Sequence, residues 1–241
     1  MKKTKSLLLS TPYLVWMVAF TLIPLGVVAY YALTDPATGA FSLGNLKSLG
    51  MYLPVLWKSI AYSLVSAMIC LLLGYPVAYY IAHRSPVAQK FLYMLVMLPM
   101  CMSFLLRTLA WVGLLQDTGI INTLLTRLGL PRLTLIRTPA AVVLGMVYNY
   151  LPYMILPLSM PGILSGMTMV FVPAVSTFYI SQKLGGTDTV LIGDVIERQF
   201  KQGNNPNLGA ALSLVLMVLV FVCTGIMNRF GGDEAEGGVV V

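Results

Sequence analysis

Charged side chains are scarce in this sequence. Of its 241 residues, 10% are charged and 58% are hydrophobic, and the mean hydropathy is +0.86. A soluble domain carries roughly a quarter charged residues, so this composition excludes an ordinary water-soluble surface. Apolar stretches near 20 residues long are therefore interpreted as membrane-spanning helices, because a helix satisfies its own backbone hydrogen bonds in lipid.

Histidine and cysteine are also rare. The chain has one histidine, His83, and three cysteines, Cys70, Cys101 and Cys223, each of which lies inside an apolar segment. There is no CxxC spacing and no cluster of histidines and carboxylates, so we expect no metal and assign the cysteines to packing.

No catalytic constellation accompanies the predicted spans. An intramembrane protease needs paired aspartates, or a serine with a base, inside its spans. Here the carboxylates fall in loops or in the tail, and no Gly-rich loop ends in the Lys-Ser or Lys-Thr pair that binds ATP. The sequence predicts no enzyme and no cofactor.

The net charge of +7 does not indicate nucleic acid as a partner. The basic residues are scattered between apolar stretches and form no basic stripe interleaved with aromatic residues, which favours membrane lipid as their anionic neighbour.

The hydrophobic pattern predicts an all-α polytopic transmembrane helix bundle of about six spans within one transmembrane domain, residues 1–230. A disordered acidic tail is predicted at 231–241. The expected spans are 7–33, 59–82, 91–115, 139–157, 161–180 and 208–228. The first apolar run is too long for a signal peptide, so we expect it to remain as an uncleaved span.

Between the spans, residues 117–138 are too polar to cross a membrane, but apolar residues recur there at helical spacing. This pattern predicts a short interfacial helix. The segment from 181 to 207 is interpreted as a polar loop. An even number of spans places both termini on one side, and Lys2, Lys3 and Lys5 favour the cytoplasm, although arginines at 117–138 oppose this orientation.

Arg107 is the one charge inside an apolar segment, and it precedes Trp111 by one turn. One interpretation is a side chain that reaches the outer headgroups while Trp111 anchors the helix at the interface. The alternative is a role at the outer mouth of a substrate pathway.

Tyr148, Asn149 and Tyr150 place two phenols and an amide within a span. They either line a pathway or form hydrogen bonds between helices. Aromatic faces would suit a cationic substrate through cation–π attraction.

Asp188, Asp194 and Glu197 form an acidic group in the 181–207 loop. We expect them to face outward, where they attract a polycation, dock a binding protein, or simply form a solvated face.

Taken together, segments along nearly the whole chain resemble the B-type permease subunit of spermidine/putrescine ABC importers, within the binding-protein-dependent transport permeases. The segments that carry the resemblance are residues 105–115, 119–122, 147–158, 161–163, 171–174, 184–186 and 191–194. The resemblance implies a type I ABC importer permease fold and a bacterial cell membrane location. It also implies three kinds of protein partner: a second permease, two cytoplasmic ATPase subunits and an extracellular binding protein. Substrate then moves by alternating access.

The chain departs from this family at one place. Its members carry a cytoplasmic loop with a Glu-Ala-Ala pattern between the fourth and fifth spans, and the short helix of that loop docks into the ATPase. Here Leu158 is followed directly by Ser159, Met160, Pro161 and Gly162. We expect that coupling to the ATPase is impaired in this region.

The leading functional expectation is a polyamine importer permease. The alternatives are a permease for another small organic solute and a non-transporting membrane scaffold. The missing loop reflects a truncated copy or sequence error, a deliberate deletion, or a variant that couples only through its partner.

Overall fold

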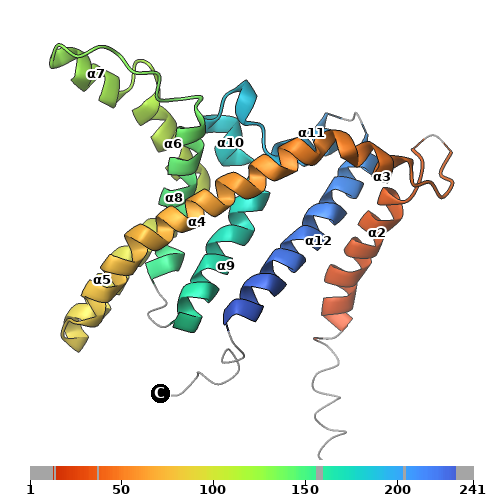
Figure 1. Ribbon diagram of the computed structural model, residues 1–241, viewed down its shortest axis with the longest axis horizontal. Coiled ribbons are helices and arrows are strands. Elements are labelled where there is room, and N and C mark those ends of the chain that lie inside the picture. The colour runs from red at the N-terminus through yellow and green to blue at the C-terminus, as the bar shows by residue number, and fades with distance from the viewer. Residues whose placement is uncertain (1–12, 14, 37, 156–159, 203–204, 232–241) are drawn as a thin grey trace, which may run out of the picture. The chain divides into compact units, whose positions relative to one another are not determined.

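The structure is a computed structural model that describes residues 13, 15–36, 38–155, 160–202 and 205–231. Within these ranges the regular secondary structure is helical (Figure 1). The α-helices are α2 Ile23–Ala32, α3 Gly44–Ser48, α4 Leu53–Ala82, α5 Pro86–Met97, α6 Phe104–Leu115, α7 Ile120–Arg127, α8 Pro139–Ile155, α9 Met160–Ser176, α10 Tyr179–Leu184, α11 Ile192–Lys201 and α12 Pro206–Gly231. A π-helical turn, Val18–Leu22, precedes α2, and 3₁₀ turns lie at Leu49–Tyr52, Leu98–Cys101 and Thr187–Thr189.

Helix lengths agree with a membrane protein. Four helices of the described residues are long and apolar enough to cross a bilayer: 15–32, 44–82, 104–127 and 206–227. The shorter apolar helices α8 and α9 have 17 residues each, or about 25 Å at 1.5 Å per residue, slightly less than the hydrocarbon core of about 30 Å. The all-α, polytopic fold predicted from the hydrophobic pattern is confirmed.

The third expected span, 91–115, is divided in the structure. Helix α5 ends at Met97, a 3₁₀ turn follows, and α6 begins only at Phe104. Pro99 lacks an N–H, and Met102 has the extended dihedrals φ −85° and ψ 147°, so the helical hydrogen-bond ladder is interrupted rather than only kinked. The polar segment expected as a loop at 181–207 also contains helices, α11 and the end of α10.

Contacts between Cα atoms divide the chain into two compact units, described here separately: residues 53–195 with 219–241, and residues 1–52 with 196–218. In the larger unit, α4 packs along α8 and α9, and α10 packs on α6 and α8 (Figure 1). Glycines permit this close approach. A Cβ at Gly74 would lie 3.1 Å from the side chain of Met154, and one at Gly145 would lie 2.5 Å from Leu184.

In the smaller unit, polar side chains join the end of α2 to the chain around it. The Asn207 amide donates to the carbonyl oxygen of Thr34 at 2.7 Å, and the Asn45 amide donates to the same oxygen at 2.9 Å. Ala32, Ala210 and Ala211 form the small buried core beside them. Thr34 lies just beyond α2, and the Asn45 amide also donates to the carbonyl oxygen of Ala32, the last residue of α2, at 3.4 Å, so Asn45 satisfies a carbonyl that the helix end leaves open.

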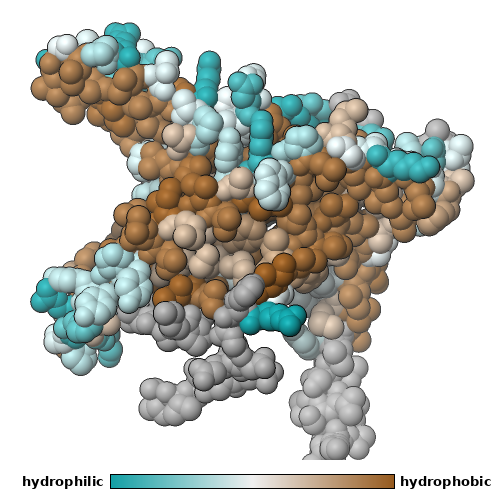
Figure 2. Space-filling model, viewed as in Figure 1, coloured by the Kyte–Doolittle hydropathy of each residue, from teal (hydrophilic) through white to brown (hydrophobic). Residues whose placement is uncertain are grey.

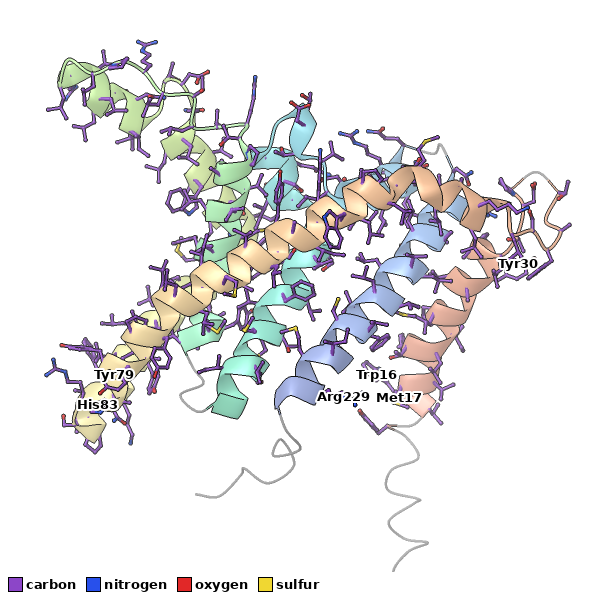
Figure 3. The ribbon with its side chains drawn as sticks, viewed as in Figure 1. Trp16, Met17, Tyr30, Tyr79, His83 and Arg229 are labelled. Carbon is purple, nitrogen blue, oxygen red and sulfur yellow. The ribbon has the colours of Figure 1, made fainter. Side chains whose placement is uncertain are left out.

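Helix α4 is followed by His83, which lies in an exposed turn. The ring of His83 lies 4.2 Å from that of Tyr79, centroid to centroid, and its Nδ1 lies 2.9 Å from the Tyr79 carbonyl oxygen (Figure 3). Arg84 covers the Tyr80 ring at 4.1 Å. These contacts are local to the helix end and suggest no chemistry.

Much of the outer surface is apolar. Figure 2 shows hydrophobic residues over most of the helices in view, and side chains such as Leu72 and Phe221 are more than 60% exposed. Exposing apolar patches of this extent to water would be energetically unfavourable, whereas lipid tails would cover them.

Candidate translocation site

The side chain of Arg107 lies inside the larger unit, one turn into α6. Only 8% of the residue is exposed, and two nitrogen atoms of its guanidinium, Nε and Nη1, are buried without a hydrogen-bond partner. The burial of these two nitrogen atoms places most of the guanidinium inside the larger unit rather than on its surface.

Tyr150 of α8 is buried and interacts electrostatically with this arginine. It is 7% exposed, and its hydroxyl donates to the carbonyl oxygen of Pro173 in α9 at 3.4 Å. The same hydroxyl interacts with the side chain of Thr177 and lies within electrostatic range of Arg107 and Tyr153. Arg107 and Tyr150, two candidates that are 43 positions apart in the sequence, thus lie within electrostatic range of each other.

Tyr148 and Asn149 point in different directions from α8. Tyr148 is 37% exposed and meets Trp111 of α6 edge to face, with ring centroids 5.4 Å apart. Asn149 is buried, and its amide donates to the carbonyl oxygen of Gly145 at 2.9 Å, one turn back in the same helix. Of this pair, Tyr148 presents a surface that a ligand can reach, and Asn149 does not.

Asp194 has a structural role in the first turn of α11. It is 2% exposed, and its carboxylate accepts a hydrogen bond from the backbone N–H of Leu191 at 2.8 Å, as in a capping box. The next N–H, of Ile192, donates to the hydroxyl of Ser59 in α4 at 2.7 Å. The expected outward-facing acidic group is therefore incomplete, because its middle member is buried at a helix start.

The other two acidic residues are more accessible. Asp188 is exposed, and its carbonyl oxygen accepts a hydrogen bond from the amino group of Lys58 at 3.4 Å. Glu197, on α11, forms an ion pair with Lys201 one turn later, at 2.5 Å. Both are compatible with the solvated face proposed from the sequence.

The expected ATPase-coupling region lies between α8 and α9. Helix α8 ends at Ile155 and α9 begins at Met160, whereas Leu158 and Ser159 lie outside the described residues. Pro161 and Gly162 fall in the first turn of α9. Only four residues, 156–159, connect the two helices.

Comparison with known proteins identifies the family. The chain is 32% identical to the spermidine/putrescine transport system permease protein PotB of Haemophilus influenzae, in a match that covers 89% of the chain and 90% of the relative. It is 30% identical to PotB of Escherichia coli over 85% of the chain and 90% of that protein. The chain belongs to the PotB permease family.

A further relative of this PotB-family chain is the inner membrane ABC transporter permease protein YdcU of E. coli, 27% identical over 89% of the chain and 84% of the relative. No protein-family model matches the chain.

Solved structures agree with the fold. A bacterial ABC transporter that imports the acidic polysaccharide alginate superposes with a TM-score of 0.66 at 18% identity, covering 95% of this chain and 96% of that one. Its complex with a periplasmic protein bound to an alginate pentasaccharide gives a TM-score of 0.67 at 18% identity, with 98% of each chain covered. At this identity the likeness concerns the fold alone. Together with the PotB relatives and the apolar helices, it agrees with a multi-pass membrane protein.

The PotB-family alignment also shows a difference in length. It extends over 256 positions with the H. influenzae protein, more than the 241 residues of the whole chain, although it contains only 89% of them. The relative therefore has segments for which this chain has no counterpart.

The sequence pattern does not single out three residues that the structure connects to the candidates. Tyr153 and Thr177 interact with Tyr150, and Ser59, the first residue of an expected span, accepts a hydrogen bond at the start of α11. The sequence carried one usable signal for Ser59: together with Ser63 and Ser66 it places hydroxyls at helical spacing on one face of α4, and all three are buried.

Proposed function

We propose that this chain is a transmembrane permease subunit of an ABC importer for polyamines such as spermidine and putrescine. The observation that carries the proposal is the match to two proteins named spermidine/putrescine permeases, at 30–32% identity over 85–89% of the chain. Tyr148 and Trp111, joined edge to face, add accessible aromatic surface that would attract an ammonium group.

The proposed assembly contains this permease, a second permease, two cytoplasmic ATPase subunits and an extracellular binding protein. ATP hydrolysis then takes place on the partners, and both termini of this chain lie in the cytoplasm. With this orientation α4 and α8 run inward and α6 and α9 run outward, so the connection between α8 and α9 faces the ATPases. The pathway residues proposed within the larger unit are Arg107, Tyr148 and Tyr150.

We further propose that coupling to ATP is weakened in this subunit. The four residues between α8 and α9 are fewer than a docking helix with its two turns requires, because one helical turn alone takes 3.6 residues. The greater length of the PotB alignment supports a lost segment. ATP-driven closure of an ATPase dimer moves a permease only through an element that contacts both.

Uptake by the reconstituted assembly tests the substrate. The chain is co-expressed with its neighbouring permease, ATPase and binding protein, and uptake of labelled spermidine into vesicles is measured with and without ATP. Excess putrescine should compete, whereas an amino acid or a sugar should not. Competition by an unrelated solute alone would replace the polyamine proposal with the alternative of another small organic solute.

Insertion of a PotB-type loop after Leu158 tests the coupling. The insert should increase ATPase association and ATP-dependent uptake, and an unstructured Gly-Ser insert of equal length serves as the matched control. Equal ATPase binding with and without the loop would show that the lost segment is not the coupling element. If the assembly forms and neither version transports, the scaffold alternative holds.

A further inference from the structure

Helix α7 and the segments on either side of it form a cavity lined by polar and charged residues. The cavity has a volume of about 310 Å³, and its lining includes Asp117, Thr123, Thr126, Arg127 and Arg132. The candidate span 104–127 includes both α6 and α7, but the helix is broken between them, since α6 ends at Leu115 and α7 begins only at Ile120. A short helix after such a break, at the end of a span, fits the level where a bilayer places its headgroups.

Two structural devices bring the arginines to the same cavity. Gly129, with φ +75°, ends α7 in a left-handed turn, and the N–H of Leu130 donates to the carbonyl oxygen of Leu125 at 2.9 Å. Beyond the turn, the side chain of Asn122 holds Leu133 at two points: its amide donates to the Leu133 carbonyl, and its oxygen accepts from the Leu133 N–H, both at 2.9 Å. Asn122 is 1% exposed, so this clamp is a built feature that fixes residue 132 against α7.

The charge of the cavity is positive. Arg127 and Arg132 outnumber Asp117, and in the described part of the chain no ion pair joins that aspartate to either arginine. The two guanidinium groups and the hydroxyls of Thr118 and Thr123 provide hydrogen-bond donors of the kind that phosphate oxygens accept, whereas the Thr126 hydroxyl donates to the Asn122 carbonyl oxygen at 2.7 Å.

The opposite face of α7 is apolar and uncovered. Ile120, Leu124 and Leu128 are spaced four residues apart, so they share one face, and each is more than half exposed. Figure 2 shows the hydrophobic side of this arm with polar residues above it. An apolar face beside a cationic polar face is typical of a helix that lies in the membrane interface.

We propose that this cavity binds the phosphate headgroup of an anionic phospholipid, with the acyl chains covering Ile120, Leu124 and Leu128. Arg127 stands at the border of the two faces and contacts the phosphate, and Arg132 closes the cavity from the far side of the turn. This lipid site is independent of the substrate of the importer. A lipid source is favoured over a protein partner because the arginines adjoin both the end of a span and an exposed apolar face.

The test is binding of fluorescent phosphatidylglycerol to the full chain in neutral detergent, with phosphatidylcholine as the neutral lipid. A cationic side chain near a membrane surface contributes about fivefold to the affinity for anionic lipid. R127Q/R132Q should therefore lose about 25-fold in affinity for phosphatidylglycerol. R84Q/K90Q removes the same charge at another helix turn and should change this affinity less than twofold.

The outcomes separate the sources of the anion. R127K/R132K should restore most of the phosphatidylglycerol affinity, which a folding defect in the glutamine variant would not predict. Equal losses in both glutamine variants would reduce the effect to net charge and overturn the proposal. Displacement of the lipid by millimolar inorganic phosphate would assign a free-anion site. Unchanged lipid affinity with loss of a co-purified second permease would assign a protein partner.

Discussion

Replacement of Arg107 by methionine should stabilise the protein. Nε and Nη1 of the guanidinium are buried and have no hydrogen-bond partner. Each buried, unsatisfied donor costs about 1–3 kcal/mol, so the two together cost about 2–6 kcal/mol. Methionine fills a comparable volume with a flexible apolar chain and leaves no donor unsatisfied.

The expected gain in the free energy of unfolding is about 2 kcal/mol or more, which corresponds to a rise of about 4–8 °C in melting temperature for a chain of this size. The assay is thermal unfolding in detergent, followed by the fraction that stays monodisperse. Arg84→Met is the matched control. Arg84 is exposed and stacks on Tyr80, so its loss should cost at most about 1 kcal/mol.

Polyamine uptake is measured on the same Arg107→Met protein. A rise in melting temperature with loss of uptake would show that the buried charge is retained for transport at a cost in stability. A fall in melting temperature would refute the reasoning, because it would mean that the guanidinium makes stabilising bonds in the folded protein.

Three further predictions concern packing and capping, and each is checked by the same melting assay. Gly145→Ala should lower the free energy of unfolding by about 1–3 kcal/mol because the new methyl group meets buried α10 side chains. Gly113 faces open space, so Gly113→Ala should raise the free energy of unfolding by up to about 1 kcal/mol. Similar shifts for the two variants would contradict the close helix contact. Ser59→Ala should lower the free energy of unfolding by about 1–3 kcal/mol because it leaves the Ile192 N–H at the start of α11 unsatisfied. Ser63→Ala loses only a hydrogen bond within α4 and should change the free energy of unfolding by less than about 0.5 kcal/mol. Asp194→Ala should cost about 0.5–2 kcal/mol through the lost cap, and no change would show that the α11 start is held by Ser59 alone.

The break between α5 and α6 shows where span prediction from hydropathy reached its limit. Residues 91–115 are mostly apolar, with Arg107 as the only charge, so the pattern predicts one helix with Pro99 inside it. A proline in a membrane helix causes either a kink or a break, depending on which hydrogen-bond donors neighbouring helices provide for the freed carbonyls. The local sequence does not show which donors these are. The α11 helix was missed for a different reason, since its charged residues concealed the apolar positions at 192, 195 and 196, of which the first two are buried.

Asp194 shows the same limit for a single side chain. From sequence, a carboxylate in a polar segment is expected to face solvent. Asp194 is instead buried at a helix start that contacts α4, where the hydroxyl of Ser59, 135 positions earlier, accepts a hydrogen bond from the Ile192 N–H.

The sequence by itself determined that the chain is a helical membrane protein, where most of its helices lie, and which family it resembles. These three conclusions follow from the hydrophobicity of successive residues and from the order of the motifs, both of which are local properties of the sequence. The tertiary structure alone decided that Arg107 is buried within electrostatic range of Tyr150, that Asp194 caps a helix, and that Arg127 and Arg132 share one cavity. Each of these depends on which distant segments pack together, and burial and pairing are properties of that packing.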